Sequence, residues 1–473
     1  MQKIATSKNG YEIVKKIFLI VLLFSCFGPL EGQREDALFV KKIFDAALTD
    51  ADAYVWLRHL TKEIGPRFAG SPGAEAAVHS MRRLMDTLGF DTVYLQPCTV
   101  PRWDRGAPSS GYIVNNATIG SRPLAVVTLG GTIGTGPGGI TAPIVEVQSL
   151  EEVERLGISG VAGRIVFFNR PMDPTRLNTF SAYGGAVDQR GFGLIVAARY
   201  GAKAVLVRSM TTGNDDVPHT GAVAVIDTVP QIPALSVSTN DANLLSDLLG
   251  KGEVKVHLQS NGRILPPVPS YNVIGEIRGT THPEEIILVG GHLDSWDIGE
   301  GAHDDGAGIV HSLQVFPLLS QLGYRPQRTF RCVLFMNEEN GLAGGRAYWE
   351  ASNAADEFHL AAIESDRGGF TPRGFSAQGR EDVFEGYYSK INEWLPLLEP
   401  YGLTFTTGGS GADISGLKPQ GGLLLGFLPD SQRYFDFHHT AADVFEAVNK
   451  RELELGAASI TSLVYLIDKH GLR

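Results

Sequence analysis

The chain has 473 residues, of which 43% are hydrophobic and 20% are charged. This length allows two or three domains of roughly 100–200 residues, and the composition is that of a globular protein. Acidic residues number 52 against 41 Lys and Arg, and no basic block stands out, so binding to nucleic acid is not expected. Three cysteines exclude a disulfide-based scaffold.

The N-terminal segment has the pattern of an export signal. Four lysines precede a short apolar run, Ile17 to Phe24, and Gly28-Pro29 ends the apolar stretch. A basic head with a short apolar core is typical of a secretory signal, and the run is too short to span a membrane. We predict a signal peptide at 1–32 and export to the periplasm or the extracellular space. Leu23 to Cys26 resembles a lipobox, so a lipid anchor at Cys26 is an alternative.

Helical patterns open the region that follows. Apolar residues recur with a helical period over 36–62 and 74–88, and residues 91–97 have the pattern of a strand. We assign residues 33–130 to the first part of a catalytic domain.

The pattern of predicted elements changes at the glycine-rich stretch 131–139, which marks the start of a second unit. Short strand-like runs and one helix-like run follow, and Leu265 to Pro269 (LPPVP) resembles a hinge. We predict a β-rich insert at 131–262 with its own core, leaning over the catalytic site. Its polar stretch Gly213 to Gly221 contains His219, which either reaches substrate or lies in an ordinary surface loop.

Strands and helices alternate after the insert, over 263–473. Strand-like runs lie at 271–277, 285–290, 329–336, 359–365 and 423–428, and helix-like runs lie at 306–322, 341–351, 382–398 and 451–470. This alternation predicts an α/β fold, with a parallel or mixed sheet sandwiched by helices. Functional sites in such sheets form at the carboxyl ends of the strands.

Several familiar motifs are missing or out of context. Residues 134–139 match GxGxxG, but a strand-like run rather than a helix follows, so we interpret them as a domain-boundary loop. The chain has no GxSxG, HExxH, CxxC or Walker sequence. A serine hydrolase of the α/β class is therefore poorly supported.

Metal-ligand side chains follow the predicted strands at five places. The segments contain His292 and Asp294, Asp304-Asp305, Glu338-Glu339, Glu364 with Asp366, and His438-His439 with Asp443. Each segment alone has an ordinary explanation as a helix cap, a turn or a core histidine. Together, two histidines and three carboxylates match the ligands of two cations that share one bridging carboxylate.

The order of these motifs resembles a known family. GGHLDSWDIGEGAHDDGAG, NEENG, ESDRGG and FHHTAAD are similar to the co-catalytic di-zinc exopeptidases, above all to their plasma glutamate carboxypeptidase (carboxypeptidase Q) branch. The resemblance implies two zinc ions per subunit, with His292 and Asp366 on one, Glu339 and His439 on the other, and Asp304 bridging both. It implies Glu338 as general base, a supporting role for Asp294, a protease-associated domain as the insert, and a cis Asp304–Asp305 peptide.

The expected reaction is hydrolysis of dipeptides or short peptides by a metal-activated water. A carboxypeptidase and an aminopeptidase with the same site are both open, and a non-catalytic binding protein on this fold is a third alternative. Arg367, Arg373 and Asp413 are candidates for binding a substrate terminus, with surface ion pairing as their ordinary explanation. A homodimer is an open alternative for the assembly.

Overall fold

The computed structural model describes residues 33–473. The predicted signal peptide and Cys26 lie outside these residues. Within the described range, no helix combines the length and apolar character needed to cross a membrane.

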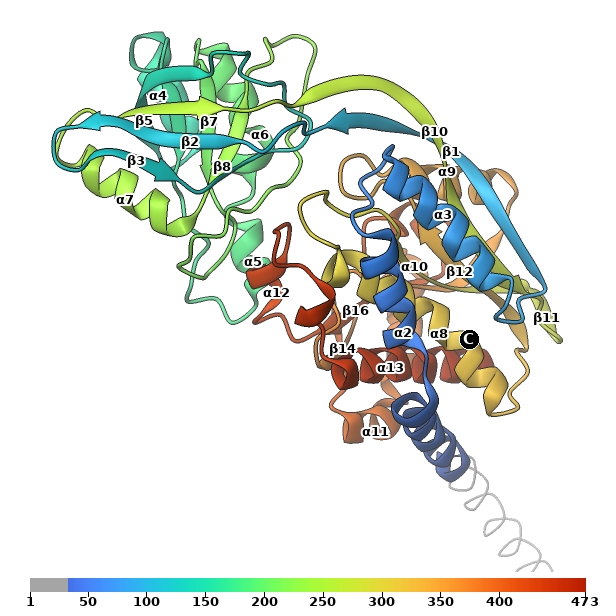
Figure 1. The fold of residues 1–473 in the computed structure, drawn as a ribbon. Helices are drawn as coiled ribbons and strands as arrows, with labels where there is room; N and C mark the ends of the chain where they lie inside the picture. The colour runs from blue at the N-terminus through green and yellow to red at the C-terminus, as the bar shows by residue number, and fades with distance from the viewer. Residues whose placement is uncertain (1–32) are drawn as a thin grey trace, which may run out of the picture.

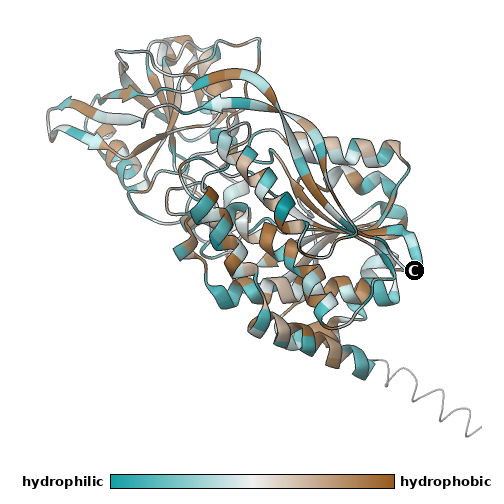
Figure 2. Cartoon of the chain, turned by 45° about the vertical axis from the view of Figure 1, so that its right-hand side comes forward, coloured by the Kyte–Doolittle hydropathy of each residue, from teal (hydrophilic) through white to brown (hydrophobic). Residues whose placement is uncertain are grey.

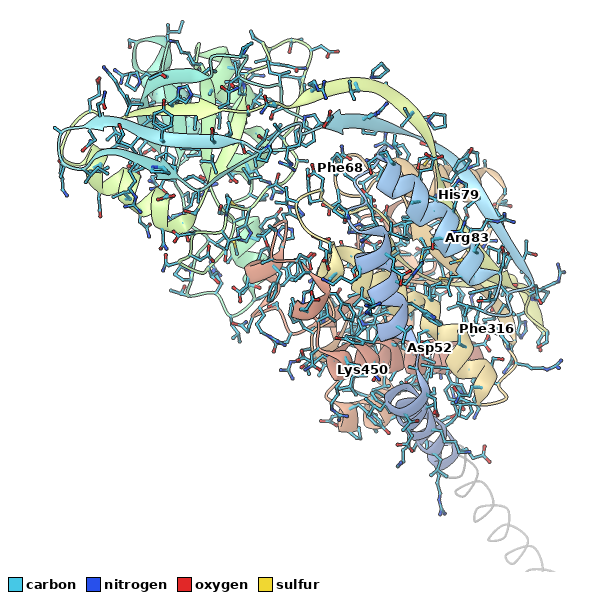
Figure 3. All side chains as sticks on the ribbon, in the orientation of Figure 1. Asp52, Phe68, His79, Arg83, Phe316 and Lys450 are labelled. Carbon is cyan, nitrogen blue, oxygen red and sulfur yellow. The ribbon has the colours of Figure 1, made fainter. Side chains whose placement is uncertain are left out.

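Two units are joined by a long two-stranded ribbon (Figure 1). Strand β1 (Thr92–Asp104) leads out of the larger unit, and β10 (Arg263–Ile277) returns antiparallel to it. Phe68, labelled in Figure 3 beside the start of α3, packs with Trp103 of the ribbon and Trp296 of the larger unit. The ribbon is therefore anchored to the larger unit by aromatic contacts.

The predicted hinge at Leu265–Pro269 is wrong, because these residues belong to β10. They pair with β1 on one side only, since β12 joins β10 from Val273 onward. A strand edge without a partner tolerates proline, which has no N–H to donate to a neighbouring strand.

The larger unit contains an eight-stranded mixed sheet, as the alternation predicted. Its order is β1, β10, β12 (Arg328–Phe335), β11 (His282–His292), β13 (Phe358–Glu364), β16 (Leu423–Pro429), β14 (Pro372–Gln378) and β15 (Thr404–Thr407). Strands β12, β11, β13 and β16 are parallel to one another. Both faces of these strands are buried, which explains their nearly continuous apolar sequences.

Helices cover both faces of this sheet. Alternate residues of the strands belong to two different cores, because successive side chains point to opposite faces. The larger core is closed by a helix over 33–50, α2 (Ala53–Arg58), η1 (His59–Ile64), α3 (Pro72–Met85), α8 (Ala307–Gln321), α10 (Glu381–Asn392), α11 (Leu395–Leu398) and α13 (Lys450–His470). The smaller core is closed by α9 (Ala343–Ala354) and η4 (Ser415–Gln420). Figure 2 shows hydrophobic residues concentrated along the strands.

The smaller unit begins after β1, near residue 105, and not at 131 as predicted. Its own eight-stranded sheet has the order β3 (Gly120–Leu124), β2 (Ser110–Asn116), β9 (Lys255–Gln259), β5 (Ile140–Val147), β6 (Ile165–Phe168), β7 (Ala204–Arg208), β8 (Ala234–Val237) and β4 (Val126–Thr128). The strands before 131 were assigned to the wrong unit because their partners lie far along the chain, as in the pairing of β2 with β9. Residues 131–139 consequently lie inside this unit and not at its boundary.

Helices also pack on the smaller sheet, so this unit is α/β rather than merely β-rich. They are α4 (Leu150–Val161), α5 (Thr179–Gly184), α6 (Asp188–Arg199) and α7 (Thr239–Leu249). One core cluster consists entirely of residues from this unit, as expected for an insert with its own core. A second cluster includes Phe370, Tyr434 and Phe435 of the larger unit, so the two units share apolar packing. Figure 1 shows α5 beside α12 (Tyr434–Phe437) at this contact.

Candidate metal centre

Three neighbouring parallel strands bring the predicted segments to one edge of the larger sheet. Strand β11 ends at His292, β12 ends just before Glu338-Glu339, and β13 ends just before Asp366. Because β12, β11 and β13 are adjacent and parallel, their carboxyl ends meet. His439, which follows α12, approaches the same edge from the C-terminal part of the chain.

Asp304 lies between the two histidines and presents one oxygen to each. Its Oδ1 is 3.2 Å from His292 Nε2, and its Oδ2 is 3.3 Å from His439 Nε2. Asp366 Oδ1 is 3.4 Å from His292 Nε2, while Glu339 Oε2 is 3.1 Å from His439 Nε2. The structure therefore brings all five predicted ligands together, as two groups that share one carboxylate.

His438, next to His439 in the chain, is a competing candidate for metal coordination. Its Nε2 lies 3.8 Å from Asp304 Oδ2, and the two imidazole rings stack with centres 3.5 Å apart. His439 Nε2 is closer to Asp304 and also contacts Glu339. Asp304, His438 and His439 lie close enough together to hold one ion, and these distances favour His439 over His438 as the ligand.

Hydrogen bonds in the loop around Asp304 fix the direction of the Asp304 side chain. Asp443 accepts hydrogen bonds from the backbone N–H groups of His303 (2.7 Å) and Asp304 (3.1 Å). Asp305 turns the other way and accepts from the N–H groups of His292 (2.9 Å) and Gly308 (3.0 Å). The Asp304–Asp305 peptide is cis, as expected. A Cβ at Gly308 would collide with the backbone carbonyl of Ser365 and with the carboxylate of Asp305, so only glycine allows this approach.

Asp294 holds the turn that carries the two glutamates. Its Oδ1 accepts from the N–H groups of Asn337 (2.6 Å) and Glu338 (3.0 Å), and its Oδ2 lies 3.4 Å from the N–H of Glu339. The Nδ1 of His292 donates to the backbone carbonyl of Asp294 at 3.0 Å, leaving Nε2 to face Asp304 and Asp366. Asp294 thus acts as a positioning residue.

Negative charge is concentrated and buried at this site. Burial raises the pKa of Glu339 to about 7, with Asp304 adding to the shift. Burial also raises the pKa of Glu338 well above its ordinary value, and Asp366 and Glu339 add to that increase. Glu339 Oε1 is buried without a hydrogen-bond partner among the described residues. Buried carboxylates in such numbers need cations, and a carboxylate with one oxygen beside a histidine nitrogen and the other without a partner suits metal coordination.

Arg67 supports the site and was missed by the sequence analysis. It is fully buried and donates to the carbonyls of Leu293 (2.8 Å), Glu300 (2.7 Å) and Gly301 (3.0 Å). Burial lowers its pKa to about 10, against the opposing effect of nearby carboxylates such as Asp443. Its contacts are with backbone carbonyls, which have no signature in the sequence.

The three candidates for binding a substrate terminus differ in their surroundings. Arg373 is exposed and pairs with Asp430 at 2.7 Å. Asp413 is 0% exposed, so it cannot face substrate directly. Arg367 is half-buried, and its guanidinium carbon lies 4.5 Å from the ring centre of Phe180 in α5. Among residues 33–473, no carboxylate lies within salt-bridge distance of Arg367.

Comparison with known proteins agrees with this geometry. The family model described as Peptidase family M28 matches residues 272–464. Carboxypeptidase Q of Bos taurus is 33% identical over 417 residues, which cover 88% of this chain and 85% of that protein. The chain belongs to peptidase family M28. As a member of this family it is an exopeptidase.

Solved structures of relatives extend the likeness to the fold. A peptidase M28 precursor from Shewanella amazonensis SB2B is 32% identical, with a TM-score of 0.86 and coverage of 92% of this chain and 97% of that chain. BSAP, a zinc aminopeptidase from Bacillus subtilis, has a TM-score of 0.62 at 21% identity, covering 87% of this chain and 93% of its own. The likeness to BSAP is one of fold alone.

Proposed function

We propose that this M28 peptidase is a di-zinc enzyme that removes terminal residues from short peptides, with free dipeptides as its preferred substrates. The observation that carries the proposal is the placement of Asp304, whose two oxygens face the two histidines at 3.2 and 3.3 Å. Two cations sharing one carboxylate need this arrangement.

The donor atoms suit zinc. One ion would be held by His292, Asp366 and Asp304, and the other by His439, Glu339 and Asp304. Imidazole nitrogens and carboxylate oxygens are common zinc ligands, and three protein ligands per ion leave a position open. When bound, zinc acidifies water and stabilises negative charge on the carbonyl oxygen of the substrate.

Glu338 is the proposed general base. It belongs to neither group of ligands, and the hydrogen bond from its N–H to Asp294 fixes its backbone beside them. The Glu338 carboxylate would take a proton from the attacking water and return it to the amine that leaves. Burial raises the pKa of Glu338, which strengthens it as a base.

Arg367 is the proposed reader of the substrate's carboxyl terminus. It directly follows the ligand Asp366, and Phe180 supports its guanidinium from the opposite unit. A half-buried guanidinium that has no carboxylate partner within residues 33–473 can bind a carboxylate in a bidentate manner. This favours a carboxypeptidase or dipeptidase over an aminopeptidase.

The aminopeptidase alternative has the fold likeness to BSAP in its favour. Hydrolysis rates on a panel of free dipeptides, N-acetylated dipeptides and dipeptide amides distinguish the two. We expect activity on free dipeptides, its loss with chelator, its return with zinc, and poor turnover of the amides. Rapid turnover of amides with no turnover of N-acetylated substrates would instead identify an aminopeptidase. No hydrolysis of any member with zinc present would contradict the proposed substrate class.

The remaining expectations concern the N-terminus, the smaller unit and the assembly. We propose export, on the strength of the four lysines and the apolar run before residue 25, with lipidation of Cys26 as an alternative. We also propose that the smaller unit corresponds to a protease-associated domain. Its position between two parts of the larger unit supports that interpretation. Light scattering would measure whether the protein forms a homodimer.

A further inference from the structure

The loop His219–Gly221 of the smaller unit contacts the segment that carries His439. His219 Nδ1 donates to the backbone carbonyl of His438 at 2.8 Å. The N–H of Thr220 donates to the carbonyl of His439 at 2.9 Å, and His439 Nδ1 lies 3.3 Å from the carbonyl of Thr220. His219 and Thr220 are 1% and 0% exposed, so these hydrogen bonds are shielded from water. The loop, for which a contact with substrate and an ordinary surface position were the two alternatives, is therefore a buried contact between the units.

Hydrogen bonds within the smaller unit fix the position of this loop. The N–H of His219 donates to the hydroxyl of Ser209 at 2.9 Å, and the Ser236 hydroxyl donates to the carbonyl of His219. The Thr220 hydroxyl donates to the carbonyl of Thr128 at 2.9 Å. The loop's position is thus set by the sheet of the smaller unit, since Ser236 and Thr128 lie in β8 and β4.

Arg105 links this loop to the larger unit. Its Nε lies 2.9 Å from Asp297 Oδ2, and both of its terminal nitrogens lie 3.4 Å from the Thr220 hydroxyl. The side chain is 8% exposed and lies over the rings of Trp103 and Trp296, at 4.9 and 5.9 Å from their centres. The ribbon, the loop and the larger unit therefore meet at one buried guanidinium.

These contacts determine which ring nitrogen of His439 has a lone pair free to coordinate a metal ion. A carbonyl oxygen only accepts hydrogen bonds, so the bond to Thr220 requires the proton on Nδ1. The lone pair of Nε2 is then left toward Asp304 (3.3 Å) and Glu339 (3.1 Å). His439 also has φ of +60°, a conformation that is uncommon outside glycine and that neighbouring contacts help to maintain.

We infer that the smaller unit is a structural part of the metal centre. Through His219 and Thr220 it selects the tautomer and orientation of His439, so the zinc site of His439 and Glu339 is complete only when this unit is docked. The other histidine, His292, is held by Asp294 and Asp305 of the larger unit. Loss of the loop contacts should therefore affect one zinc site and spare the other. The inference rests on the proposed binding of two zinc ions.

The test measures zinc in the full-length protein carrying His219→Ala together with Thr220→Val. Zinc content after dialysis against buffered zinc, and the affinity of each site by chelator competition, are compared with wild type. Both substitutions leave the Thr220 backbone carbonyl in place and act by removing the side-chain hydrogen bonds of the loop to His438 and Thr128. We expect one site to keep its affinity and the other to lose about 10-fold, at the lower end of the usual effect of disturbing a partner of a ligating histidine, because the carbonyl that accepts from His439 Nδ1 is then held less firmly. His219→Asn, whose amide nitrogen can replace Nδ1 as donor, should retain both ions.

The control is Thr141→Val, because the hydroxyl of Thr141 contacts His257 within the smaller unit at 2.8 Å. Circular dichroism checks that each variant is folded, and Thr220→Val alone replaces the double variant if the latter does not fold. Wild-type affinity at both sites, or equal loss at both, would overturn the inference. A wild-type protein that binds no zinc would instead overturn the proposed function.

Discussion

At the scale of single residues, the adjacent side chains of Glu338 and Glu339 have different surroundings. Glu339 contacts His439 at 3.1 Å and is 8% exposed, while Glu338 is half-buried. Within residues 33–473, the carboxylate of Glu338 forms no ion pair with a histidine. These surroundings favour Glu339 as a metal ligand and support the proposed role of Glu338 in moving a proton.

Glu338→Gln should keep the metals and lose activity. The amide cannot accept the proton of the attacking water, so we expect kcat to fall by roughly 10²–10⁴-fold. Zinc content by atomic absorption should stay at the wild-type value, whereas the matched variant Glu339→Gln should lose zinc. If zinc content fell in step with activity in Glu338→Gln, Glu338 would be a ligand and not the base.

Arg367→Gln should weaken the binding of substrates that carry a free carboxylate. Loss of a charge-assisted hydrogen bond costs about 1.5–3 kcal/mol, which corresponds to roughly a 10–100-fold increase in KM for free dipeptides. Dipeptide amides should show little change, because they lack the carboxylate. Arg373→Gln is the control, since Arg373 already pairs with Asp430. Equal changes in KM for both substrate classes would rule out carboxylate recognition by Arg367.

At the scale of elements, the first helix and the last are tied together by one buried carboxylate. Asp36, in the helix over 33–50, accepts from Tyr465 (2.8 Å), Lys469 (2.7 Å) and His470 (2.8 Å) of α13. Burial raises the pKa of Asp36, but the hydrogen bonds from Lys469 and Tyr465 outweigh it and the net pKa is lowered. Because the C-terminus of α13 is thereby fixed, this contact supports the helical layer over the larger core.

Asp36→Asn should destabilise the protein in a pH-dependent manner. A lowered pKa in the folded state stabilises the protein above the unfolded-state value of about 3.9, and this contribution is lost as the pH falls through the folded-state pKa. We expect a loss of about 1–3 kcal/mol at pH 7 in urea unfolding, shrinking below pH 4. Asp45→Asn, on an exposed ion pair of the same helix, serves as control. A pH-independent difference would contradict the role of the charge.

At the scale of the whole molecule, two units with separate sheets meet at one site. The ribbon of β1 and β10 carries the smaller unit, and Phe370, Tyr434 and Phe435 of the larger unit enter its core. The metal centre lies beside this contact, because His438 and His439 directly follow α12. Metal binding should therefore stabilise the assembled protein and not only the loops that supply ligands.

Removal of zinc should lower the thermal stability of the enzyme. Ligand bound at about 100 times its dissociation constant stabilises the folded state by roughly 2.7 kcal/mol. For a cooperative unit of this size, with an unfolding entropy of about 2.1 cal/mol/K per residue, this corresponds to a decrease in Tm of about 3–5 °C. Differential scanning calorimetry before and after treatment with chelator measures this, and added zinc should restore the transition while added calcium should not. An unchanged Tm in protein verified as metal-free would argue against structural linkage between the site and the fold.

The α/β fold of the larger unit and the residues grouped at its site were predictable from local patterns. Apolar strands that stop at His292, at Glu338-Glu339 and near Asp366 mark the carboxyl edge of a sheet, where side chains from different strands converge. Local patterns did not decide which residue of each pair faces the centre: the family resemblance implied Asp304 and His439, and the tertiary structure gives the physical reason. Asp304 and Asp305, and likewise His438 and His439, are the same residue types and differ only in backbone direction and neighbours.

The sequence by itself determined which elements form and which chemistry gathers at the strand ends, because periodicity and residue type are local properties. It did not determine where the smaller unit begins, since β2 pairs with β9 more than a hundred residues away. It also gave no sign of Arg67 or of the contact between Thr220 and His439, because the acceptors there are backbone carbonyls. Every residue has a backbone carbonyl, so only the folded structure decides which carbonyls accept hydrogen bonds from Arg67 and His439.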